Sequence, residues 1–303
     1  MIEAIIDTDP GIDDALALIL AVKSGHLNVH AVTTVAGNTC VENTTANARF
    51  VLSLLDREDI PVYSGAAKPR ERNLVTAAVH GDGELAGVRK TGPVQLTGDA
   101  ASRLVNIVRQ LPGQITILIL GPSTNVAEAI RLDATVMSQV RELVIMGGSL
   151  TGPGNMPHGA EFNVYTDPEA AATVFGFPVR KILVPLEACD LMRFDSSCFG
   201  TWPDQKIRTP VIQMMDGFSD ALLKLNRERG IALYDPLTVY YALNKDAYQL
   251  VRRRIRVGVC DGVDRGCTIG RGVSEDEETG DVLVAESIDL EVFRRDFVEI
   301  LER

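Results

Sequence analysis

Short apolar runs rich in β-branched residues alternate with longer amphipathic stretches from the N-terminus to about Pro185. Two of the runs, residues 115–120 and 143–146, are apolar almost throughout, which is typical of strands buried on both faces of a parallel sheet. The predicted strands are residues 4–8, 29–35, 60–63, 115–120, 143–146 and 181–184. The predicted helices are residues 13–24, 41–55, 100–110, 123–132 and 168–175.

The pattern changes after Pro185, where helical periodicity dominates and the strand-like runs are shorter. Helices are predicted over residues 211–229, 236–243 and 290–301. Short strands are predicted over residues 254–260, 268–269 and 282–285. Together the two parts predict an α/β fold, with a mostly parallel central sheet, helices on both faces and a helical elaboration in the C-terminal half. Because no linker rich in Gly, Ser or Pro divides the chain, we expect residues 1–303 to form a single domain.

Polar residues are concentrated in four segments that directly follow predicted strands, namely residues 7–14, 36–38, 121–125 and 147–163. In an open α/β sheet, ligands bind beyond the carboxyl ends of the strands, near the point where the strand order reverses. We therefore expect these four segments to form the functional site together.

The segment 7–14 has the sequence DTDPGIDD and carries four carboxylates within eight residues. One or two of them can cap the following helix, since Asp favours N-cap and first-turn positions. Four carboxylates at the end of a buried strand would repel one another strongly without a cation, and oxygen ligands suit Ca²⁺ or Mg²⁺. Asp13 and Asp14 would point about 100° apart on a helix, so that one can face a metal and the other a substrate.

Composition and charge restrict the partners. A formal net charge of −11 over 303 residues argues against nucleic acid, because phosphate binding needs a basic surface. No apolar run approaches the ~20 residues that a membrane helix needs. The N-terminus lacks the basic region of a targeting segment, and the five cysteines are scattered without CxxC spacing. We expect free thiols, no zinc site and a cytoplasmic location.

Five ordered segments resemble the inosine-uridine-preferring nucleoside hydrolase family. They are DTDPGIDDA from Asp7, VAGNTCVENT from Val35, GPSTNVA from Gly121, GGSLTGPGNMPHGAEFNVYTDPEAA from Gly147 and YDPLT from Tyr234. The resemblance implies an enzyme that hydrolyses the N-glycosidic bond of ribonucleosides to free base and ribose. It also implies a bound Ca²⁺, a role in purine or pyrimidine salvage and a homodimeric or homotetrameric assembly.

The family's site residues are carried over by position. Asp9 matches the metal-bound carboxylate that also acts as general base. Asp13 matches a residue that binds the ribose hydroxyls. The other metal ligands match Asp14, Asp235 and the main-chain carbonyl of Leu120. The remaining sugar-binding positions match Asn38, Asn155, Glu161 and Asn163.

The chemistry of these residue types agrees with the resemblance. Cleavage of a glycosidic bond builds positive charge on the sugar, and a metal-held water can attack it while a carboxylate such as Asp9 takes the proton. Glu161 and Asn163 are two residues apart, so in an extended segment their side chains would point to the same side. Amides and carboxylates both bind vicinal hydroxyls, although Asn and Gly are also common in plain turns.

The chain departs from the family pattern at two places. Tyr234 stands where well-known members carry a His that is implicated in protonating the leaving base. With a reference pKa near ~10, a tyrosine is a weaker acid, so Tyr234 either donates a proton or packs against the base. The segment 79–85 resembles the family's HGxxGL loop with Glu84 in place of a Gly, and His80 there is expected to contact the ribose or the base or to serve only in packing.

Two other functions are compatible with parts of the sequence. A haloacid-dehalogenase-type phosphotransferase also begins with a DxD loop and needs a divalent cation, but it requires Thr or Val where this chain has Gly11. A non-catalytic binder of nucleosides or ribose on the same fold is the second alternative. Neither GxxxxGK[ST] nor a strand-linked GxGxxG is present, so nucleotide binding of those types is unsupported. The preferred base is not determined by these residues.

Overall fold

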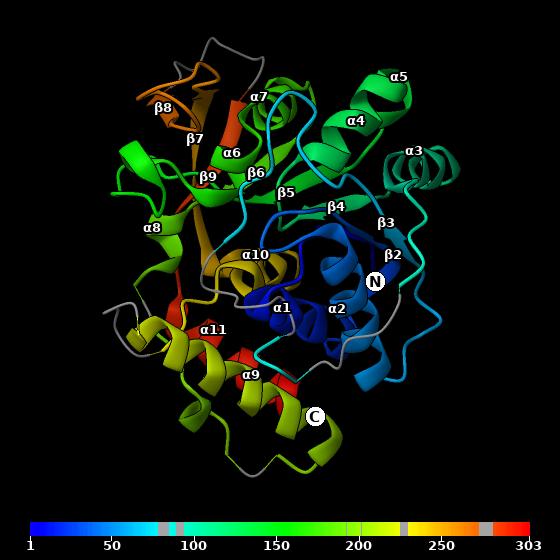
Figure 1. The fold of residues 1–303 in the computed structure, drawn as a ribbon, viewed down its shortest axis with the longest axis vertical. Coiled ribbons are helices and arrows are strands. Elements are labelled where there is room, and N and C mark those ends of the chain that lie inside the picture. Colours follow the sequence, from blue (N-terminus) through cyan, green and yellow to red (C-terminus); the bar gives the residue numbers. More distant parts are fainter. Residues whose placement is uncertain (78–84, 89–93, 192, 201, 225–229, 273–280) are drawn as a thin grey trace.

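The structure, a computed structural model, describes residues 1–77, 85–88, 94–191, 193–200, 202–224, 230–272 and 281–303. Within these ranges a nine-stranded sheet runs through the molecule in the order β3-β2-β1-β4-β5-β6-β9-β7-β8 (Figure 1). Neighbouring strands are parallel from β3 to β9, and only β7 runs antiparallel to its neighbours. The mostly parallel sheet predicted from the sequence is therefore confirmed. None of the helices in the described part of the chain is both long enough and apolar enough to cross a membrane.

The strand bounds agree with the predicted runs to within a few residues for the first six strands. The strands are β1 (Ile2–Thr8), β2 (Leu27–Thr34), β3 (Val62–Ser64), β4 (Thr116–Ile119), β5 (Glu142–Met146), β6 (Lys181–Val184), β7 (Tyr248–Val257), β8 (Thr268–Gly272) and β9 (Asp281–Ile288). The chain moves from β1 to β2 and β3 on one side and then returns to place β4 on the other side of β1. The strand order thus reverses between β1 and β4, where a ligand crevice is expected.

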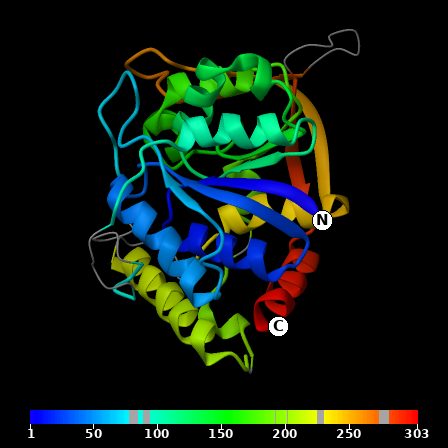
Figure 2. The ribbon, with the colours of Figure 1, turned by 90° about the vertical axis from the view of Figure 1, so that its right-hand side faces the viewer.

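Helices cover both faces of the sheet (Figures 1 and 2). One face carries α1 (Ile12–Lys23), α2 (Val41–Leu54), α9 (Gln205–Lys224), α10 (Tyr234–Leu243) and α11 (Leu290–Glu302). The other face carries α3 (Ala100–Gln110), α4 (Thr124–Leu132), α5 (Ala134–Met137) and α7 (Pro168–Gly176). Successive residues of β1 alternate between the two cores: Ala4 and Ile6 join the first, and Ile5 joins the second. Helices on both faces explain why the strands are apolar almost throughout.

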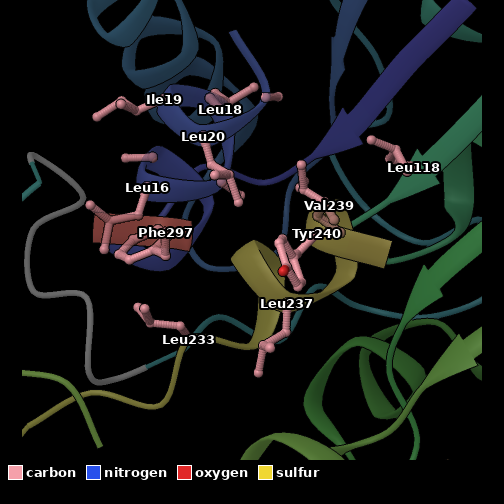
Figure 3. Packing of buried hydrophobic residues seen from close by; sticks show 14 of the residues in the cluster. Leu16, Leu18, Ile19, Leu20, Leu118, Leu233, Leu237, Val239, Tyr240 and Phe297 are labelled. Carbon is pink, nitrogen blue, oxygen red and sulfur yellow. The ribbon is translucent and has the colours of Figure 1, made fainter. Parts of the chain in front are cut away.

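The helix α1 is buried all round, which is why its sequence lacks a polar face. Leu16 and Leu20 lie in the same core as Leu237 and Val239 of α10 and Phe297 of α11 (Figure 3). Because α1 and α10 pack against each other, the first turn of α10 is brought to the acidic N-terminal end of α1. This packing joins residues more than two hundred positions apart in the sequence.

The sequence-based bounds are least accurate after Pro185. The helix predicted to begin at residue 211 begins at Gln205, where Asp204 caps it by accepting a hydrogen bond from the Lys206 N–H at 3.0 Å, and Pro210 lies inside the helix. The predicted end at residue 229 lies outside the described residues. The strand predicted from residue 254 begins at Tyr248.

Candidate active site

A cavity of about 420 Å³ lies at the carboxyl ends of the central strands. Asp9 follows β1, Asn38 follows β2, Leu120 follows β4 and Met146 ends β5, and all four line this cavity. The same cavity is lined by Tyr234 and Asp235 from the first turn of α10 and by residues 155–163. Three of the four segments predicted to form the site, residues 7–14, 36–38 and 147–163, therefore line one cavity at the reversal of strand order, whereas segment 121–125 contributes no lining residue and Leu120 just before it does.

Three carboxylates form a tight group, in which Asp14 and Asp235 are buried and Asp13 is half-buried. Asp13, Asp14 and Asp235 each offer one oxygen, and these oxygens all lie within 4.8 Å of one another. Burial raises the pKa of all three, and their mutual repulsion raises the pKa of Asp13, to about 7, and of Asp235 further. One Asp13 oxygen, Oδ1, is buried without a hydrogen-bond partner among the described residues. Such a group is costly without a cation, so it is suited to hold one.

Asp9 lies beside this group and is 1% exposed. Its Oδ2 accepts a hydrogen bond from the Asn38 N–H at 2.7 Å. Burial raises its pKa most, and the negative charges of Asp14 and Asp13 raise it further. A Cβ on Gly121 would lie 2.5 Å from Asp9 Oδ1, so the chain after β4 passes directly against this carboxylate.

The Asp9 carboxylate leaves no room for a side chain at residue 37, which is a glycine. A Cβ there would lie 2.9 Å from both Asp9 Cγ and Pro122 Cδ, and closer still to Asp9 Oδ2. We expect Gly37→Ala to displace the Asp9 carboxylate and to destabilise the fold by about 1–3 kcal/mol, the usual cost of overpacking. Gly176→Ala is the matched control, because nothing lies within 4 Å of a Cβ at that helical position. Chemical denaturation of both variants measures the effect, and equal stabilities would contradict it.

Asp14 caps the helix α1 and also has oxygen lone pairs that can bind a cation. Its Oδ2 accepts hydrogen bonds from the Gly11 N–H at 2.9 Å and from the Asn38 side-chain amide at 3.1 Å, and Thr8 donates to its Oδ1. The Gly11 bond is a helix cap at the start of α1, so the capping interpretation accounts for part of this residue's role. The remaining lone pairs leave Asp14 able to face a cation with Asp13 and Asp235.

Asp7, the first of the four carboxylates in the acidic segment, is not part of the group. Its Oδ1 accepts hydrogen bonds from Thr33 Oγ1 at 2.5 Å and from the Asn125 side-chain amide at 2.8 Å. Burial raises its pKa to about 7. The cluster expected from one loop is therefore assembled from Asp9, Asp13 and Asp14 of that loop and from Asp235 of α10.

Glu161 and Asn163 line the cavity, but not from an extended segment as predicted. Glu161 is the N-cap of α6 (Phe162–Thr166), and its carboxylate accepts hydrogen bonds from the N–H groups of Asn163 at 2.8 Å and Val164 at 3.1 Å. This cap starts a helical turn, which a period-two interpretation could not detect. The Asn163 side-chain amide donates to the Leu120 carbonyl at 2.7 Å. Asn155 lines the cavity while its Oδ1 accepts a hydrogen bond from the Phe162 N–H at 2.8 Å.

Tyr234 contacts a charged neighbour at the cavity wall. Its hydroxyl donates a hydrogen bond to Asp190 Oδ1 at 2.6 Å, and Arg193 Nη2 lies 3.7 Å from the same oxygen. Burial raises the pKa of the Tyr234 phenol most, and the Asp190 carboxylate raises it further. The proton of Tyr234 is therefore held more tightly than that of an ordinary tyrosine.

The comparisons with known proteins agree with this geometry. Residues 4–295 match the family described as inosine-uridine preferring nucleoside hydrolase. The chain belongs to this family. The match confirms the family, the enzyme class and the reaction class that the five sequence segments predicted.

Individual relatives of this nucleoside hydrolase span nearly the whole chain. The pyrimidine-specific ribonucleoside hydrolase RihA of Salmonella agona (strain SL483) is 34% identical over 281 residues, which cover 88% of this chain and 87% of the relative. RihA of Escherichia coli O1:K1 / APEC is also 34% identical, over 276 residues and the same shares. A plant nucleoside hydrolase, the PpNRh1 enzyme, superimposes with a TM-score of 0.88 at 31% identity and covers 99% of this chain and 98% of its own.

Several cavity residues of this nucleoside hydrolase were not found from the sequence. They are Thr76, Ala77, Met156, Phe162, Arg193, Phe218, Leu222 and Ala232. Phe218 and Leu222 lie on α9, where their spacing of four residues is the same as that of ordinary core positions. No motif marks Arg193 or Asp190, because their roles depend on how residues 190–193 meet α10. The predicted residue His80 lies outside the described residues.

Proposed function

We propose that this nucleoside hydrolase binds a ribonucleoside in the cavity and hydrolyses its N-glycosidic bond with Asp9 as the general base. The observation that carries the proposal is the gathering of four carboxylates at one end of a cavity that amide side chains also line: Asp9, Asp14 and Asp235 are buried, and Asp13 is half-buried. Positive charge develops on the sugar as the bond breaks, and buried negative charge stabilises it.

The donor set fits a bound Ca²⁺. Calcium takes oxygen ligands at 2.3–2.6 Å, and the oxygens of Asp14 and Asp235 lie within 4.8 Å of each other, close enough to bind one ion. Asp9, Asp14, Asp235 and the Leu120 carbonyl would hold it. That carbonyl accepts the Asn163 amide and keeps a second lone pair. When bound, the ion supplies a nucleophilic water of lowered pKa and a contact for sugar hydroxyls.

Asp9 is the residue that removes the proton from the attacking water. Its side chain lines the cavity, and the Asn38 N–H fixes the orientation of its carboxylate. The backbone at Gly37 and at Gly121 lies directly against the Asp9 carboxylate, and this contact holds the carboxylate in one position. A fixed base beside the reacting carbon lowers the entropic cost of the attack.

Ribose binding is assigned to the polar residues at the same end of the cavity. The free Asp13 Oδ1 can accept a hydrogen bond from a sugar hydroxyl. Asn155 and Asn163 are held by backbone contacts, as is Glu161, so these groups are oriented before the sugar arrives. Asn38 completes the set and also holds Asp9 and Asp14.

The products test the proposal. A panel of purine, pyrimidine and modified ribonucleosides is incubated with the full chain, and free ribose and base are quantified with and without phosphate. We expect equal amounts of ribose and base that do not depend on phosphate. Formation of ribose 1-phosphate would identify a phosphorylase, and binding without turnover would favour a non-catalytic binder.

The effect of Tyr234→Phe shows whether the phenol donates a proton to the leaving base or only packs against it. Because the hydroxyl is bonded to Asp190 and its pKa is raised, we expect its removal to lower kcat by no more than about tenfold, the equivalent of one hydrogen bond. Tyr240→Phe is the control, since that hydroxyl bonds to Asp296 at 2.5 Å and the residue does not line the cavity. A collapse of kcat specific to Tyr234→Phe would identify the hydroxyl as the proton donor to the base.

A further inference from the structure

One part of the cavity wall differs from the rest in chemistry. Residues 193–234 contribute Phe218, Leu222 and Ala232, which are apolar, together with Tyr234 and Arg193. Among the cavity-lining residues that the structure describes, Arg193 is the only basic side chain. The acids and amides that suit a sugar come from other segments. An apolar wall with one cation and one phenol suits a planar heterocycle that acquires negative charge.

A single carboxylate orients both polar groups of this wall. Asp190 Oδ1 accepts the Tyr234 hydroxyl at 2.6 Å and lies 3.7 Å from Arg193 Nη2. Asp190 follows directly after α8 (Leu186–Cys189), which itself follows β6, so the pair is attached to the sheet. The side chains of Arg193 and Asp190 are 40% and 42% exposed, and an ion pair with this exposure adds little to stability. Its effect is therefore the orientation of Arg193 at the cavity.

The proposed reaction needs a group at the leaving base. When the bond between the sugar C1′ and the base nitrogen breaks, its electron pair goes to the base. The phenol of Tyr234 is a poor source of the proton, because its hydroxyl already donates a hydrogen bond to Asp190 Oδ1 at 2.6 Å. A guanidinium keeps its charge at any working pH and offers several N–H donors in one plane. Its charge can stabilise the departing base without giving up a proton.

We propose that Arg193, oriented by Asp190, stabilises the negative charge that develops on the leaving base. The inference rests on the proposed function. Water supplies the hydroxyl that bonds to C1′ and one proton that passes to Asp9, while the electron pair of the broken bond stays on the base nitrogen beside Arg193. The base takes up a proton from solvent as it departs, and Asp9 releases its proton to solvent, so that nucleoside and water give ribose and neutral base. Asp190 is a positioning residue in this scheme.

The test compares two leaving groups in the full-length enzyme. p-Nitrophenyl β-D-ribofuranoside has a leaving group that departs readily as an anion, whereas uridine and inosine have poor ones. We expect Arg193→Gln to lower kcat on the nucleosides by ~10²–10³-fold, the typical effect of removing one charge-stabilising donor. The kcat on the nitrophenyl riboside should stay at the wild-type value.

Two further variants serve as controls for Arg193→Gln. Arg193→Lys should restore part of the lost kcat on nucleosides. Arg57→Gln should have no effect on kcat, because Arg57 pairs with the exposed Asp59 away from the cavity.

Asp190 variants test the orientation. Asp190→Asn keeps an oxygen that can accept the Tyr234 hydroxyl but removes the charge that faces Arg193. We expect a loss in kcat on nucleosides smaller than that of Arg193→Gln, with unchanged kcat on the nitrophenyl riboside and rescue by Asp190→Glu. Equal losses on both kinds of substrate, or no loss on nucleosides, would overturn the inference and leave the proposed function intact. A wild-type enzyme inactive on every riboside would overturn the proposed function itself.

Discussion

Asp9→Asn should reduce kcat on every ribonucleoside by ~10²–10⁴-fold, the usual contribution of a positioned general base. The substitution keeps the size of the side chain and an oxygen for the Asn38 N–H, so it removes the base function with little change in packing. Steady-state kinetics with saturating calcium measure the loss. Near-normal turnover in this variant would exclude Asp9 as the general base.

The same substitution should stabilise the metal-free protein. Asp9 is buried, and the charges of Asp14 and Asp13 raise its pKa, so its ionised form opposes folding near neutral pH. A neutral amide removes that repulsion, and we expect a higher Tm for metal-free Asp9→Asn than for the metal-free wild type. Asp59→Asn, at an exposed carboxylate paired with Arg57, is the control and should leave Tm unchanged. A lower Tm for Asp9→Asn would mean that lost packing exceeds the relieved repulsion.

The second large effect that we expect is a lower Tm when calcium is removed. A ligand at about one hundred times its Kd stabilises a protein by ~2.7 kcal/mol, which for a chain of 303 residues corresponds to a rise in Tm of roughly 4–5 °C. We therefore expect calcium to raise Tm by this amount over chelator-treated protein. Differential scanning calorimetry measures the shift, with Asp235→Asn as the variant in which it should shrink. Equal Tm values with and without calcium would contradict a metal site.

The pH dependence of metal binding follows from the raised pKa values. The pKa of Asp13, which lies beside the proposed ligands Asp14 and Asp235, is raised from 3.8 to about 7, so near neutral pH its protonation removes a negative charge next to the cation. Calcium affinity should fall as the pH falls from about 8 to about 6, and binding should release protons. Because the folded pKa exceeds the unfolded one, the metal-free protein should lose stability as the pH rises through about 7. Titration calorimetry in two buffers of different ionisation enthalpy measures the proton release.

Local pattern was sufficient for the sheet and for most helices on it. Apolar runs such as residues 115–120 are recognisable because helices cover both faces of each strand. The segment at Glu161 was interpreted as extended because a side-chain cap, and not periodicity, starts α6. The start of α9 was missed because Asp204, ahead of Pro210, caps the helix.

The site was predictable where its residues lie in recognisable segments. Asp13, Asp14 and Asp235 come together as the resemblance implied, through the packing of α1 on α10. The position of Asp7 was not predictable, since only the structure brings Thr33 and Asn125 to its carboxylate. The same holds for Arg193, whose proximity to Tyr234 depends on tertiary packing that no sequence spacing encodes.

The most direct test of the account measures ribose release from uridine and inosine by the wild-type enzyme in phosphate-free buffer, first after chelation and then after calcium is restored. We predict ribose and base in equal amounts with calcium, and activity that disappears on chelation and returns with the metal. Turnover that is unaffected by chelation would contradict the role assigned to the buried carboxylates, and ribose 1-phosphate as a product would contradict hydrolysis.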